Sequence, residues 1–221
     1  MDVRIEMTYR TPKGTETRFE SEVMRAPMAV LIAEDLGRTG RAKELRFIDS
    51  SDGAWTMKEL KKFLEGIQTE PHDVTVYFDG GFNRETRYSG LGCAIYYEQN
   101  GKSYRLRKNA LVKELWNNNE AEYAAFHLAL KELELLGVHH LPVTFIGDSQ
   151  VVINQLSGEW PCYEEELVAW MERIEEGFEK LGITAQYELV ARNQNREADQ
   201  LASQALKEID ITSNLELEKE K

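Results

Sequence analysis

Four carboxylates stand at positions where metal-dependent chemistry could use them. Asp79 and two glycines end VTVYFDGG, whose β-branched and aromatic residues are typical of a buried strand. Asp148 ends a second such run, Val143 to Gly147, while Glu122 and Asp199 lie in segments with helical spacing. If the two strands are neighbours, all four carboxylates can reach one sheet edge. Such a cluster is tolerated when divalent cations neutralise it, and all-oxygen ligands suit Mg²⁺ or Mn²⁺ rather than zinc.

Periodicity alone does not establish this convergence, because strand-Asp-Gly is also the commonest way to start a turn. Four separate blocks add specificity: YFDGG, NNNEAEYAAF, GDSQVVINQLSGEW and VARNQNREADQLASQAL. In this order and spacing they resemble the four blocks of type-1 ribonuclease H. The resemblance covers about residues 74–206 and is greatest to the reverse-transcriptase-like subgroup of compact bacterial and archaeal enzymes.

The resemblance implies an endonuclease that hydrolyses the RNA strand of RNA/DNA hybrids and leaves a 5′ phosphate. It implies two Mg²⁺ ions, with Mn²⁺ as a substitute, one activating water and the other stabilising the departing 3′ oxygen. The implied catalytic and metal-binding residues are Asp79, Glu122, Asp148 and Asp199. Glu122 takes the catalytic position, whereas Glu120 is interpreted as a helix-start acid favoured by the helix dipole.

The resemblance also implies contacts with the substrate. Asn118 is a candidate groove contact, although it could equally cap the helix, a role for which Asn117 is better placed. Many family members have a histidine before the last acid, where this chain reads Arg192-Asn193-Gln194-Asn195. Arg192 is the best substitute and could hold phosphate rather than shuttle protons. The full set of expected substrate-binding residues is Gly80, Asn118, Asn119, Ser149, Gln150, Arg192 and Asn195.

The elements that must position these residues follow from hydrophobic periodicity. An antiparallel meander of three strands comes first, then a long helix whose small residues allow close packing on a sheet. We expect an α/β, ribonuclease H-like fold in which helices flank a five-stranded mixed sheet. The expected strands cover 74–79, 91–97, 103–111, 143–147 and 184–190, and the expected helices begin near 117, 151, 164 and 197.

Residues 1–67 predict a separate small α+β domain with the order ββαβα, which resembles the hybrid-binding domain attached to some ribonucleases H. A linker over 68–73 and a mobile tail over 207–221 complete the expected organisation. The small domain is a candidate for binding nucleic acid or a partner. Its basic residues could meet phosphate and Trp55 could stack on a sugar or base, or else they form a solvated loop and a packed turn. Those basic residues are Arg38, Arg41, Lys43 and Arg46.

Charge and composition limit the functional classes. The chain has 221 residues and a net charge of −12, which argues against strong non-specific binding to nucleic acid. Residues 72–206 hold 12 basic and 21 acidic side chains, against 12 and 13 in residues 1–71. The lysine-rich handle helix of some relatives is replaced by acidic Glu164–Lys180. Hybrid affinity would then have to come from elsewhere.

No apolar run approaches membrane-spanning length and no signal peptide is evident, so we expect a cytoplasmic protein without membrane contact. We also expect a monomer. Cys93 and Cys162 are expected to be buried thiols, and Trp116 and Trp160 to fill core or rim positions. Two alternatives to hybrid hydrolysis remain open. One is a catalytically weak ribonuclease H-fold module that binds nucleic acid or protein, and the other is a different metal nuclease on this fold.

Overall fold

Two hydrophobic cores divide the chain into two units, Met1–Thr69 and Glu70–Lys221. The computed structural model describes residues 1–218, apart from the side chains of Ile67 and Gln68. Within that part of the chain, no helix is both long and apolar enough to cross a membrane. Each unit is considered by itself below.

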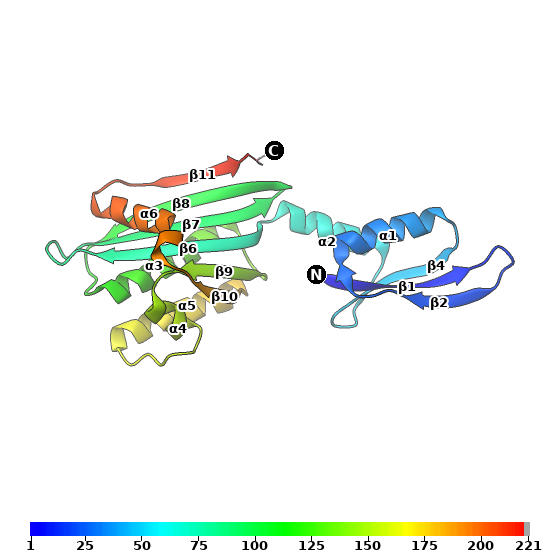
Figure 1. Cartoon of the computed structure of the whole chain (residues 1–221), viewed down its shortest axis with the longest axis horizontal. Helices are drawn as coiled ribbons and strands as arrows, with labels where there is room; N and C mark the ends of the chain where they lie inside the picture. Colours follow the sequence, from blue (N-terminus) through cyan, green and yellow to red (C-terminus); the bar gives the residue numbers. More distant parts are fainter. Residues whose placement is uncertain (219–221) are drawn as a thin grey trace. The chain divides into compact units, whose positions relative to one another are not determined.

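The first unit is an antiparallel sheet covered by two helices (Figure 1). The helix α2 begins with a reciprocal cap, because Thr56 and Glu59 each accept a hydrogen bond from the other's backbone N–H. Trp55 donates its indole N–H to Asp49 over 2.7 Å and packs on Phe63, so it lies in a packed turn. The elements are β1 (Asp2–Arg10), β2 (Glu16–Glu20), β3 (Met24–Arg25), α1 (Ala26–Arg38), β4 (Ala42–Asp49), β5 (Ala54–Trp55) and α2 (Met57–Thr69), with sheet order β2-β1-β4-β5.

The second unit contains a mixed sheet of six strands in the order β10-β9-β6-β7-β8-β11. The central strand β6 pairs with β9 in parallel and with β7 in antiparallel orientation, and β9 pairs with β10 in parallel. The predicted α/β class with a flanked mixed sheet is therefore confirmed. The strands are β6 (His72–Phe82), β7 (Ser89–Gln99), β8 (Lys102–Val112), β9 (Pro142–Gly147), β10 (Thr184–Leu189) and β11 (Thr212–Leu217).

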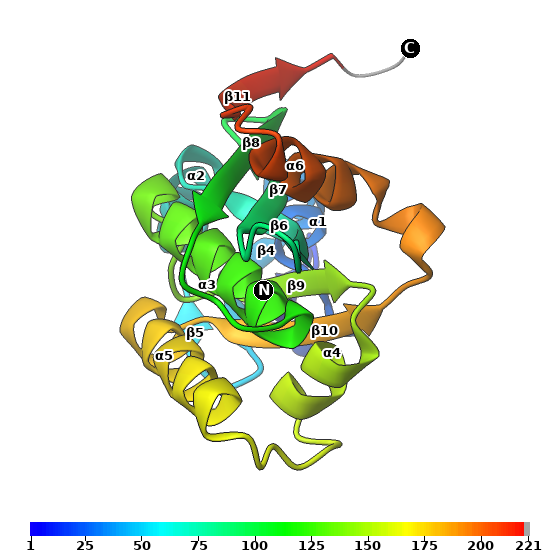
Figure 2. The ribbon, with the colours of Figure 1, turned by 90° about the vertical axis from the view of Figure 1, so that its left-hand side faces the viewer.

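Helices cover both faces of this sheet, with α3 on one face and α6 on the other (Figure 2). Glycines on β6 and β7 allow both helices to pack close to the sheet. A Cβ at Gly80 would clash with Ala121 of α3, and a Cβ at Gly92 would clash with Ala198 of α6. α5 packs beside α3. The helices are α3 (Asn118–Leu136), α4 (Gln150–Leu156), α5 (Glu165–Leu181) and α6 (Arg196–Leu206), with the 3₁₀ turn η1 (Arg192–Gln194) before α6.

The expected five-stranded sheet and mobile tail need correction, because Thr212–Leu217 adds a sixth strand to β8. Asn109 of β8 holds the segment that leads into this strand. Its side chain accepts a hydrogen bond from the Ile211 N–H at 2.7 Å and donates one to the Ile209 carbonyl at 2.9 Å. Residues 219–221 of the expected tail lie outside the described residues. The linker expected over 68–73 is also shorter, since α2 continues to Thr69 and β6 begins at His72.

Candidate catalytic site

Strand register places two of the predicted carboxylates at one sheet edge. β6 and β9 run parallel with Tyr77 opposite Ile146, and Asp79 and Asp148 each lie two residues farther along. Carboxyl ends of adjacent parallel strands meet at the same edge, so the two acids are neighbours. The strands that carry Asp79 and Asp148 are therefore neighbours, as the sequence predicted.

The helix α3 brings Glu122 to the same place. Asn117 caps α3, its Oδ1 accepting from the Glu120 N–H at 2.9 Å, and Gly80 lets the first turns approach β6. The Gly80 N–H donates to Glu122 Oε2 over 3.2 Å. Glu120 instead accepts hydrogen bonds from the Trp116 N–H and the Trp170 indole. The structure thus directs Glu122, and not Glu120, toward Asp79.

The Gly80→Ala substitution is expected to displace Glu122, because the new Cβ would lie 2.2 Å from the backbone carbonyl of Ala121. Overpacking of this kind costs about 1–3 kcal/mol of unfolding free energy. Chemical denaturation and Mn²⁺ titration by calorimetry would measure the lost stability and weakened ion binding.

The adjacent Gly81→Ala is the matched control. Its Cβ would make ordinary contact with Leu206 at 3.5 Å, so stability and Mn²⁺ affinity should stay close to those of the parent chain. Equal behaviour of the two variants would contradict the steric role of Gly80.

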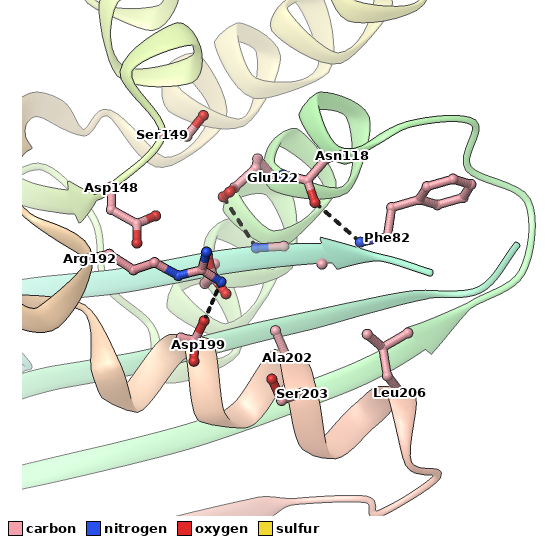
Figure 3. Close-up of a pocket in the computed structure, with 13 residues that line it drawn as sticks. Phe82, Asn118, Glu122, Asp148, Ser149, Arg192, Asp199, Ala202, Ser203 and Leu206 are labelled. Carbon is pink, nitrogen blue, oxygen red and sulfur yellow. Dashed lines mark hydrogen bonds and ion pairs between the residues drawn. The ribbon is translucent and has the colours of Figure 1, made fainter. Parts of the chain in front are cut away.

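Asp79, Glu122 and Asp148 form a tight carboxylate cluster in a pocket of about 480 Å³ (Figure 3). One oxygen of each side chain lies within 4.8 Å of the others, and Asp79 and Glu122 are only 7% and 5% exposed. Burial, followed by repulsion from Asp148 and Asp199, raises the pKa of Asp79 to about 7. Burial and the charges of Asp79 and Asp148 also raise the pKa of Glu122.

The fourth predicted acid, Asp199, lines the same pocket from α6 but is bound by Arg192. The Arg192 guanidinium donates to Asp199 Oδ1 over 2.9 Å, and this pair raises the pKa of Arg192. Arg192 is exposed at its position in η1. It is the one basic side chain among the described residues that line the pocket.

The residues present fit a divalent-cation site. No lysine, arginine or histidine among residues 1–218 lies within ion-pair distance of Asp79, Glu122 or Asp148. The Arg192 charge only partly offsets the three converging carboxylates, which provide the oxygen donors that Mg²⁺ and Mn²⁺ prefer. Asp199 could join them if Arg192 turns toward another anion.

The predicted substrate contacts divide into two groups. Gly80, Asn118 and Ser149 line the pocket, whereas Asn119 and Gln150 are not among its lining residues. Asn118 does not cap α3; its Oδ1 accepts from the Phe82 N–H at 3.2 Å. Ser149 is the N-cap of α4, which fixes its hydroxyl at the rim.

Asn195 is a correction to the expected substrate contacts, because its side chain is only 1% exposed. Its Nδ2 donates to the Phe78 carbonyl over 2.9 Å, which ties the start of α6 to the strand that carries Asp79. Ser203 also lines the pocket and is not among the residues predicted from the sequence. The signal was available, since Ser203 follows Asp199 by four residues and so shares its helix face.

Comparisons of the sequence identify its relatives. The model of the reverse transcriptase-like family matches residues 77–205. The uncharacterized protein YpeP of Bacillus subtilis (strain 168) is 43% identical over 206 residues, which cover 93% of this chain and 91% of that protein. That similarity therefore extends through both units.

Solved structures are similar to the second unit. RNase H1 from the halophilic archaeon Halobacterium salinarum NRC-1 is 26% identical, with a TM-score of 0.52, covering 61% of this chain and 98% of that one. LC11-RNase H1, isolated from compost by a metagenomic approach, is 25% identical with a TM-score of 0.54, covering 61% and 96%. A structure of LC11-RNase H1 in complex with RNA/DNA hybrid shares the fold at 24% identity and a TM-score of 0.54, covering 62% and 98%.

Proposed function

Since the chain belongs to the reverse transcriptase-like family of ribonuclease H proteins, we propose that it is a metal-dependent endonuclease that hydrolyses the RNA strand of RNA/DNA hybrids. The resemblance to type-1 ribonuclease H predicted from the four sequence blocks is confirmed, and the fold with its acidic pocket is that of a ribonuclease H-type nuclease. The observation that carries the proposal is the cluster of the buried Asp79 and Glu122 with the half-buried Asp148.

The proposed ligands for two Mg²⁺ ions, or for Mn²⁺ in their place, are Asp79, Glu122, Asp148 and Asp199. When bound, the cations would supply activation of water and charge stabilisation at the departing 3′ oxygen. Once ionised, these carboxylates place negative charge at a sheet edge, where a phosphodiester alone would be repelled. Substrate binding therefore depends on that charge being neutralised.

Arg192 has the second role in this proposal. Its guanidinium lies at the pocket rim and its pair with Asp199 joins two exposed or half-exposed groups, so exchange for a phosphate costs little. A phosphate bound by Arg192 would free Asp199 to face the cluster. None of the four histidines lines the pocket, so no imidazole there moves a proton.

The preference for hybrid is proposed from the pocket and its relatives. Asn118 and Ser149 offer an amide and a hydroxyl beside the carboxylates, and such groups can recognise the 2′-hydroxyl of RNA. LC11-RNase H1, a protein of the same fold, has been solved with RNA/DNA hybrid bound. We further propose that the enzyme acts as a monomer in the cytoplasm.

Labelled substrates would test the proposal directly. Hybrid, duplex RNA, duplex DNA and single strands are incubated with the full chain and Mg²⁺, Mn²⁺ or a chelator. Metal-dependent internal cleavage of RNA in hybrid alone, with 5′ phosphate on the products, is the expected result. Cleavage of another substrate would instead indicate a different metal nuclease, and hybrid binding without cleavage would indicate a binding module.

The first unit is proposed to add hybrid affinity. Arg38, Arg41, Lys43 and Arg46 are exposed, and none lies within ion-pair distance of a described acid. Other basic side chains of this unit are already paired: Arg4 with Glu20 at 2.6 Å, Arg10 with Glu16 at 3.0 Å, and Lys61 with Glu34 at 2.5 Å. The unpaired set can therefore meet phosphate without first breaking an ion pair.

Deletion of residues 1–69 should raise the Michaelis constant more than it lowers the turnover number, because the carboxylates lie in the second unit. The plot of log affinity against log salt should also flatten by somewhat under one unit per lost phosphate contact. Steady-state kinetics and anisotropy titrations at several salt concentrations would measure both. Unchanged affinity and slope would assign the first unit to protein interaction or folding.

A further inference from the structure

An exposed aromatic and basic surface lies beside the catalytic pocket. It consists of Arg87 and Tyr88 from the β6–β7 turn with Lys113 and Trp116 from the segment between β8 and α3, and is called the Trp116 surface below. Trp116 is 65% exposed, so of the two positions expected for it, core or rim, the core position is excluded. A hollow of about 490 Å³ is lined by Arg87, Lys113, Glu114, Leu115 and Trp116.

Each cation of the Trp116 surface lies over an aromatic ring. The Arg87 guanidinium is 4.8 Å from the centre of the Trp116 ring, and the Lys113 ammonium is 5.0 Å from that of Tyr88. Neither cation has an ion-pair partner within the described part of the chain. The rings thus hold two positive charges in place while leaving them free for an anion.

Backbone contacts fix both segments that form this surface. In the turn, Asn83 donates its N–H to the Tyr88 carbonyl and accepts the Arg87 N–H, both over 2.8 Å. In the other segment, Trp116 donates its N–H to Glu120 over 2.8 Å, and the preceding Leu115 is buried. The backbone of both segments therefore has little freedom left to lose on binding, which favours affinity.

The Trp116 surface is joined to the catalytic pocket from both sides. Phe82 lines the pocket and directly precedes the turn, while Asn118 lines the pocket two residues after Trp116. The Phe82 N–H donates a hydrogen bond to Asn118 Oδ1, which links the two segments directly. Figure 3 shows both residues at the same end of the pocket. A polymer that occupies the pocket and extends past Phe82 therefore meets Trp116.

We infer that the Trp116 surface binds the sugar–phosphate backbone of the nucleic acid next to the cleaved segment. Arg87 and Lys113 contact phosphates, and the exposed part of the Trp116 indole packs on a sugar or base. Charge complementarity selects this occupant, because two unpaired cations stand out on a chain of net charge −12. Glu114 lines the hollow and Glu85 is exposed in the turn, so the surface is suited to a few phosphates and not to a broad polyanion. The inference rests on the proposed function.

Binding is measured on the full chain carrying Asp148→Asn, which keeps a hybrid intact in Mg²⁺, by fluorescence anisotropy over a salt series. Trp116→Ala should raise the dissociation constant about 5- to 150-fold, the range expected for one lost stack. Trp116→Tyr should recover part of this loss. Arg87→Ala and Lys113→Ala should each lower the salt slope by about 0.9.

The chain offers matched controls away from the pocket. Trp160 is an exposed tryptophan between α4 and α5, and Arg173 lies over Trp170 at 4.7 Å in the same kind of pair. Trp160→Ala and Arg173→Ala should each leave the dissociation constant within about twofold of the parent value. The salt slope should stay within about a few tenths of a unit. Thermal melting of every variant separates lost binding from lost folding.

Two sets of results overturn the inference. One is a Trp116→Ala variant with parental affinity and slope, and the other is equal losses in the Trp160 and Arg173 controls. Weakened binding of a polyglutamate peptide without weakened binding of hybrid would assign the surface to an acidic protein partner and also reject it.

The proposed function fails separately. If the parent chain cleaves no hybrid but Trp116 still governs its binding, the nuclease activity is rejected and the Trp116 surface stands. If the parent chain cleaves hybrid with a Michaelis constant that Arg87, Lys113 and Trp116 do not affect, the reverse holds.

Discussion

The Asp148→Asn substitution is expected to abolish cleavage of RNA/DNA hybrid while leaving the free energy of unfolding unchanged or higher. Asn removes an anionic ligand where the reaction requires several kcal/mol of charge stabilisation, so turnover should fall by at least about 1,000-fold. The same change removes a charge that raises the pKa of Asp79 and of Glu122. Repulsion in the metal-free protein therefore decreases.

Single-turnover cleavage and urea denaturation in the presence of chelator would measure the two effects on the same preparation. Asp210→Asn is a suitable control, because Asp210 is an exposed acid that does not line the catalytic pocket. Cleavage by Asp148→Asn at the parental rate would remove Asp148 from the metal site, and a large loss of stability would reject the repulsion argument.

The second large effect is on the pH dependence of stability in the metal-free protein. The folded state raises the pKa of Asp79 from 3.8 to about 7, so it binds this proton more tightly than the unfolded chain does. The free energy of unfolding should therefore fall as the pH rises from about 4 to about 7. Above about pH 7 Asp79 is ionised in both states, and the decrease should be complete. The difference between 7 and 3.8 corresponds to at most about 4 kcal/mol.

Unfolding curves between pH 4 and pH 8, with and without Mg²⁺, would test this expectation. Asp79→Asn should match the parent near pH 4 and exceed it at pH 8, because it lacks the titrating group. Mg²⁺ should stabilise the parent more at pH 8 than at pH 5, since the cation binds ionised carboxylates in the folded state. Stability of the parent that rises between pH 5 and pH 7 by the same amount as in Asp79→Asn would refute the assignment.

The convergence of the carboxylates could be predicted because strand ends and helix starts leave few geometric choices. Asp79 and Asp148 each end an apolar run, and a parallel pairing of β6 and β9 then brings them together. The sequence could not show that Asp199 is bound by Arg192, since that pair depends on the position of η1. Local patterns describe which face a residue occupies, not which charge lies opposite it.

Two other outcomes show why particular residues were misjudged. Asn195 belongs to a family block, yet its amide is buried against the Phe78 carbonyl and serves to position α6. β11 was missed because TSNLEL is followed by a charged end and lacks a clear apolar run. Its pairing depends on Asn109, which is far away in sequence.

The added strand β11 also bears on solubility. β8 is an 11-residue strand, and without β11 one whole side of it would present unpaired N–H and C=O groups to other molecules. β11 pairs with Ser103–Lys108 of that edge and presents a new edge of 6 residues, of which Thr212, Ser213, Asn214 and Glu216 are polar. The last strand thus acts as a built-in guard against self-association, and a chain ended at the last residue of the family match would keep its catalytic carboxylates while losing that protection.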